Sequence, residues 1–68
     1  MKIWNVNVSY TELENDDLGT YGTKEKAMEA AASEMKLDPG WKRSYFTDNE
    51  IHYSNGEWVL VVESLYVA

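Results

Sequence analysis

The chain has 68 residues, a hydrophobic fraction of 44% and no cysteine, which predicts one small domain over residues 1–68 with a packed core. Its net charge is −6, from six lysines and arginines against twelve acids. This balance argues against direct binding to a nucleic-acid backbone or an anionic membrane surface, since both attract clustered bases. Without cysteine or an apolar leader after Met1, the expected location is the cytoplasm, or the host cytoplasm if a phage encodes the chain.

Residues 2–10 alternate between apolar and polar side chains, which predicts a strand with one buried face. Trp4, Val6 and Val8 belong to one side of that strand. The next segment, residues 11–22, contains an acidic Asn-Asp-Asp run and two glycines, and it predicts a turn or loop. A short hairpin around the acidic tip is the alternative for this segment.

Thr23 is suited to cap a helix that continues to about Lys36. Apolar residues at spacings of three and four share one face of this helix, and all are small or flexible: Met28, Ala31, Ala32 and Met35. Such a stripe allows the helix to lie close to a sheet whose own side chains are large.

Residues 41–47 and 50–54 predict two further strands, with one strand bent at Asp48-Asn49 as the alternative. Asn55-Gly56 follows them and predicts a two-residue hairpin turn of type I′, because both residues tolerate positive φ. That turn sets a register in which Tyr53 lies opposite Trp58. The last strand is apolar on both faces, which is typical of a central strand.

Together these elements predict an α+β domain in the order β-loop-α-β-β-β. It has one antiparallel β-sheet of 3–4 strands with a single α-helix packed on one face. The hairpin register groups one set of side chains under the helix: Ile51, Tyr53, Trp58, Leu60 and Val62. One helix cannot cover both faces of such a sheet, so the second face is expected to be exposed or used.

The residues argue against metal, cofactor or catalytic chemistry. His52 is the only histidine and cysteine is absent, so the usual ligands of zinc, iron and copper are too few. The acidic run lacks calcium-loop spacing, and no glycine-rich phosphate loop is present. Glu50 lies two residues from His52 on the same strand face, but the chain has no nucleophile elbow beside this pair. We therefore expect no enzyme activity, no cofactor and no metal.

The predicted function is binding and inhibition of another protein that has a basic surface. Candidate protein-binding residues lie in the acidic segment and on the uncovered sheet face: Glu12, Glu14, Asp16, Asp17, Glu50, His52, Val59, Val61 and Glu63. One form of this hypothesis is a nucleic-acid mimic that presents carboxylates where phosphates would lie. In size and charge alone, the chain is similar to small acidic proteins of phages and mobile elements that block host enzymes or defence systems.

Two other functions fit the same sequence. A self-associating structural module would pack the exposed sheet face against a copy of itself as a homodimer. A small ligand-binding protein or enzyme would use aromatic side chains as stacking platforms, for example for a sugar. The aromatic residues are the strongest functional lead if they stay exposed, and the alternative is that they form the core: Trp4, Trp41, Tyr45, Tyr53, Trp58 and Tyr66.

Overall fold

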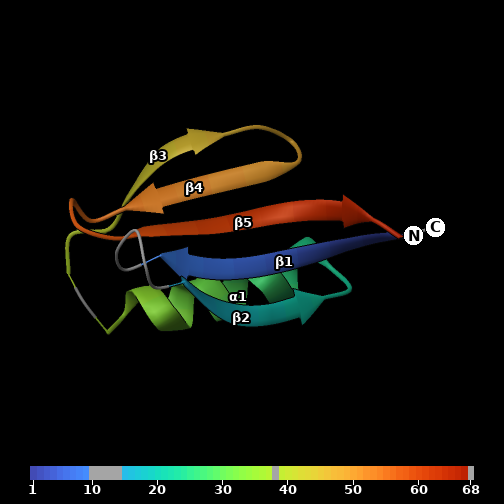
Figure 1. The fold of residues 1–68 in the computed structure, drawn as a ribbon, viewed down its shortest axis with the longest axis horizontal. Coiled ribbons are helices and arrows are strands. Elements are labelled where there is room, and N and C mark those ends of the chain that lie inside the picture. Colours follow the sequence, from blue (N-terminus) through green and yellow to red (C-terminus); the bar gives the residue numbers. More distant parts are fainter. Residues whose placement is uncertain (10–14, 38, 68) are drawn as a thin grey trace.

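The computed structural model describes residues 1–9, 15–37 and 39–67. Its elements in chain order are β1 (Lys2–Ser9), β2 (Asn15–Tyr21), α1 (Lys24–Met35), β3 (Lys42–Phe46), β4 (Glu50–Ser54) and β5 (Val59–Tyr66). The strands form one antiparallel sheet in the order β2-β1-β5-β4-β3, with α1 against one face (Figure 1). The α+β class with a single helix on an antiparallel sheet is confirmed. The predicted number of strands was too low, because the sheet has five.

The additional strand is β2, in a segment predicted to be a turn or loop. Asparagine, aspartate and glycine are depleted in strands, so local propensity favours a turn there. The backbone N–H and C=O groups along the free edge of β1 need hydrogen-bond partners, and β2 supplies them. This pairing outweighs the local turn propensity. The register shifts between Val6 and Asn7, as at a β-bulge, and Gly19 beside the shift has a φ of +117°. The part of the possible hairpin that falls on residues 10–14 lies outside the described residues.

The helix α1 begins as predicted. The Thr23 hydroxyl accepts a hydrogen bond from the Lys26 N–H at 3.2 Å, and α1 ends at Met35. The predicted buried stripe was partly wrong, because Ala27 and Ala31 are fully buried whereas Ala32 is exposed. The stripe is rotated by about one position, since side chains on a helix point back toward its N-terminus.

The core lies between α1 and the middle of the sheet. It contains small and branched side chains together with one tryptophan: Trp4, Val6, Val8, Ala27, Ala31, Ile51, Leu60 and Val62. The strand β5 is the middle strand of the five, which confirms the prediction from its two apolar faces. Trp4 is 6% exposed, whereas Trp58 is only half-buried, so the aromatic residues divide between core and surface.

The hairpin between β4 and β5 has a different turn from the predicted one. Tyr53 lies opposite Leu60, two positions away from the expected partner Trp58. Among the described residues only glycines have positive φ, and Gly56 has a φ of +98°, so a type I′ turn is excluded. Asn55 instead closes the turn, because its Oδ1 accepts hydrogen bonds from the N–H groups of Glu57 (3.0 Å) and Trp58 (2.8 Å).

Replacing Gly56 with Val should lower the free energy of unfolding by at least about 1 kcal/mol, since a β-branched residue resists positive φ. A Cβ at this position would meet no atom within 4 Å, so the expected loss comes from the backbone alone. Urea denaturation would measure it. Gly56→Asn is the matched control, because asparagine tolerates positive φ better and should recover part of the loss. Equal midpoints for the wild type and Gly56→Val would contradict the assigned turn.

The helix covers only one side of the sheet and only part of that side. Its backbone comes close to β1, β2 and β5 but, within the described residues, not to β3 or β4. In Figure 1 the helix lies behind β1 and β2, and no helix stands in front of the sheet. Within the described ranges, no helix is long and apolar enough to cross a membrane.

Candidate functional site

The sheet face turned away from α1 is called the open face below. Strand pairing arranges its side chains in rows that cross the strands. The central row contains Tyr45, His52, Val61, Asn7 and Asp17, and a second row contains Glu50, Glu63, Asn5 and Thr20. A third row contains Lys42, Ser54, Val59, Ser9 and Asn15. Neighbours within a row lie about 5 Å apart, so each row forms one continuous strip of side chains.

Apolar side chains on the open face are concentrated along β5. Val59 is 40% exposed and Leu65 is 45% exposed, and the half-buried Val61 lies between Asn7 and His52. Tyr45, which is 51% exposed, extends this apolar surface onto β3. Exposed apolar groups interleaved with polar ones are typical of surfaces that bind other proteins.

A histidine and two carboxylates meet beside this apolar surface. His52 Nε2 lies 3.1 Å from Glu50 Oε1, which confirms the contact expected from their spacing. The Tyr45 ring packs edge-on against His52, with ring centroids 5.1 Å apart. Glu63 lies directly opposite Glu50 on the neighbouring strand. Like charges in this position repel, so the pair is unfavourable in the isolated protein.

An amide network forms the other half of the open face. Asn5 Nδ2 donates hydrogen bonds to Asp17 Oδ1 at 3.1 Å and to the Gly19 carbonyl at 3.2 Å. Asn7 Nδ2 donates to Asn5 Oδ1 at 3.0 Å. Asp17 Oδ1 also accepts from the Gly19 N–H at 2.9 Å. The network therefore holds β1, β2 and the bulge in one fixed arrangement.

The predicted binding residues fall into three groups. Glu50, His52, Val59, Val61 and Glu63 all lie on the open face, as their alternation with core residues implied. The described part of the acidic segment is divided between the two faces of the sheet. Asp17 belongs to the open face, but Asp16 pairs with the core residue Val8 and so lies on the helix side. Glu12 and Glu14 lie outside the described residues.

Asn5, Asn7 and Tyr45 are among the open-face residues that the sequence did not indicate as binding residues. Asn5 and Asn7 had been recognised only as the polar side of a strand, and Tyr45 only as one of several aromatics. Two amides spaced two residues apart lie side by side on one strand face, so their spacing was a usable signal. The sequence does not indicate that Asp17 is their hydrogen-bond partner, because the composition of its segment predicts a loop.

His52 contacts Glu50 and Tyr45, and the hydroxyl of the nearby Ser44 donates to the His52 carbonyl at 3.3 Å, not to its ring. In the part of the chain that the structure describes, no group of three or more histidine, cysteine, aspartate or glutamate side chains could hold a metal ion.

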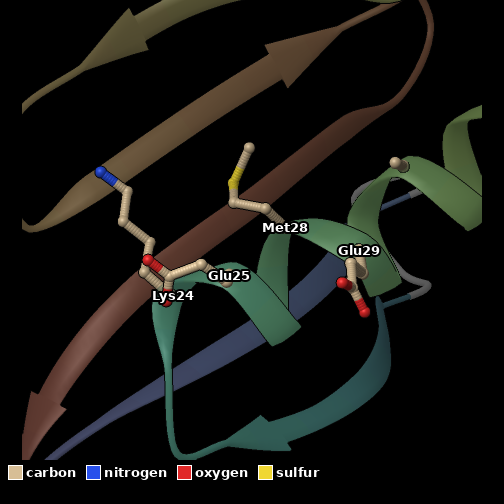
Figure 2. A pocket seen from close by; sticks show the side chains of 5 residues that line it. Lys24, Glu25, Met28 and Glu29 are labelled. Carbon is tan, nitrogen blue, oxygen red and sulfur yellow. The ribbon is translucent and has the colours of Figure 1, made fainter.

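A shallow open groove runs along α1. It is lined by Lys24, Glu25, Met28, Glu29 and Ala32 (Figure 2). Figure 2 shows Lys24 and Met28 extending to one side of the helix and Glu29 to the other. Ligand pockets usually bury about 70–90% of a small molecule. A groove lined by one stripe of a single helix does not enclose a ligand in this way, so the open face is the stronger candidate.

Comparison with known proteins gives no relative. No protein-family model matches the chain, and searches of curated proteins and of solved structures gave no match.

Proposed function

We propose that this protein is a non-catalytic binding module that docks its open face on a basic surface of another protein and inhibits that partner. The observation that carries the proposal is an uncovered sheet face on which exposed apolar residues lie beside acidic ones. The finer proposal of an anti-defence inhibitor or nucleic-acid mimic, encoded by a phage or mobile element and acting in the host cytoplasm, is supported by size and charge.

The size of the open face suits a small or transient interface. With about 3.3 Å per residue along a strand and about 4.8 Å between strands, the five strands offer a flat area of roughly 500 Å². Standard interfaces bury about 800 Å² on each partner, and transient ones bury less than about 600 Å². Most of the open face would have to take part, which favours a contact centred on β5, the middle strand.

The charges favour a basic partner over a second copy of the chain. The strands place Asp17, Glu50 and Glu63 on the open face, and Lys42 is the one described lysine or arginine there, at a corner. A symmetric dimer through this face would bring these carboxylates toward those of the copy. A basic surface would neutralise them instead. Self-association through the open face is therefore the alternative function, and analytical ultracentrifugation detects it.

Binding to the natural partner should weaken as salt rises, because exposed charges are screened over about 8 Å at physiological ionic strength. We expect proteins captured from a native-host extract at about 0.05 M salt to be released at about 0.5 M. Mass spectrometry identifies them, and analytical ultracentrifugation of the protein alone tests self-association. A complex that is equally stable at both salt concentrations would remove the electrostatic part of the proposal.

The acidic segment is tested separately with Glu12→Gln, Glu14→Gln and Asp16→Asn combined in one variant. Rim charges act mainly on the association rate, so about a two- to fivefold loss of affinity is expected with the fold unchanged. Asp17 is left intact, because its carboxylate accepts hydrogen bonds from Asn5 and Gly19 and its loss would alter the fold. If this variant loses more affinity than an open-face variant does, the partner contacts the acidic segment and not the open face.

A further inference from the structure

The hydrogen bonds of the open face use its amide donors internally. Asn5 Nδ2 faces Asp17 Oδ1 and the Gly19 carbonyl, which only accept, so the orientation of this amide is fixed. Asn5 Oδ1 must then be the acceptor for Asn7 Nδ2. This leaves Asn7 Oδ1 as an acceptor with no partner among the described residues. The amide half of the open face therefore presents the Asn7 Oδ1 acceptor near the Asp17 carboxylate.

The other half of the open face has the same polarity. His52 Nε2 lies 3.1 Å from Glu50 Oε1, so the ring faces a carboxylate oxygen. The Glu63 carboxylate has no hydrogen-bond or ion-pair partner within the described residues. Together with Glu50 opposite it, Glu63 adds carboxylate oxygens next to the apolar Val61. A partner that satisfies this surface has to bring donors and positive charge.

Of the described lysines and arginines, only Lys42 lies on the open face, at a corner. Lys2 and Lys24 lie on the helix side with their Nζ atoms 5.1 and 5.7 Å from the centroid of the Trp4 ring. Arg43 lies on that side too, with its guanidinium carbon 4.2 Å from the Phe46 ring centroid. A symmetric contact of two open faces would therefore bring the carboxylates of Glu50 and Glu63 toward those of the copy, with only Lys42 at the corner as a base.

Resting on the function proposed above, we propose that the open face docks an arginine-bearing surface of its protein partner. A guanidinium presents five donors in one plane and binds carboxylates in a bidentate manner, whereas an ammonium is a compact point charge. A guanidinium between Glu50 and Glu63 relieves their repulsion, and the neighbouring rings of His52 and Tyr45 offer a surface for its flat face. Val61 and Val59 then contact the apolar part of the partner.

The test uses a hexa-arginine peptide and a hexalysine peptide as probes of the full chain. Nitrogen-15 chemical-shift mapping locates binding, and calorimetry gives affinity at low salt. The two variants Glu50→Gln/Glu63→Gln and Glu25→Gln/Glu29→Gln change the net charge equally, but the second pair lies on exposed helix positions. We expect shifts on β4 and β5, at least a tenfold loss for the first variant, and less than a threefold loss for the second.

Several results would overturn the proposal. Equal losses in the two variants would show that hexa-arginine responds to net charge alone, and equal affinity for hexalysine would remove the preference for guanidinium. A mass that rises with protein concentration would make a second copy the occupant. If Val61→Lys abolishes capture of the natural partner while Glu50→Gln/Glu63→Gln leaves it unchanged, the open face docks a partner without an arginine. If neither variant affects capture, the proposed function itself fails.

Discussion

Leu60→Ala is expected to leave the protein largely unfolded at room temperature. Leu60 is fully buried in the middle strand, with Val8 on one side and Tyr53 on the other. Truncating a buried leucine costs about 2–5 kcal/mol, because the cavity is only partly refilled. A core in a chain this small rarely supplies more than about 3–5 kcal/mol, so little stability would remain. Circular dichroism and urea denaturation measure the loss.

Leu65→Ala is the matched control, since it removes the same atoms from the same strand. Leu65 lies on the open face and is 45% exposed, so its truncation should cost less than about 1 kcal/mol. The difference between the two variants measures how strongly the faces of β5 differ in burial. A cooperative melt of Leu60→Ala within a few degrees of the wild type would contradict the assigned core.

The sequence predicted the elements whose local signals agree with their tertiary role. Thr23 caps α1 as expected, and β5 is central because a strand with two apolar faces is unsuited to an edge. It did not predict β2, since aspartate and glycine there favour a turn when considered alone. The partner of β2 is β1, and that pairing is a long-range property that no window of a few residues contains.

For the candidate site, the sequence predicted the face on which residues lie but not their cross-strand partners. The wrong turn at Asn55-Gly56 moved the hairpin register by two positions, but an even shift keeps every side chain on its face. His52, Val59 and Val61 were therefore assigned to the correct face of the sheet although their cross-strand partners were wrong. The Glu50–Glu63 pair depends on the true register and could not be predicted.

Val61→Lys is expected to abolish partner binding while the protein stays folded. Val61 is at the centre of the open face and only half-buried, so a lysine stem can lie along the sheet with its ammonium in solvent near Glu63. The expected loss of stability is less than about 1 kcal/mol. At an interface centre, a cation in place of an apolar contact should cost at least about 2 kcal/mol, or roughly 30-fold in affinity. Thermal melting and a binding titration with the captured partner measure the two effects.

Val61→Thr separates the effect of charge from the effect of shape, because threonine keeps the branched outline and the strand preference of valine. It should melt close to the wild type and retain most of the affinity, whereas Val61→Lys should retain almost none. If Val61→Lys unfolds the chain, both faces of the sheet are needed for stability, and the contact must be sought at residues 12–17. If it folds and binds as the wild type does, the open face is not the docking surface, because no partner covering β5 could accommodate the added cation without loss.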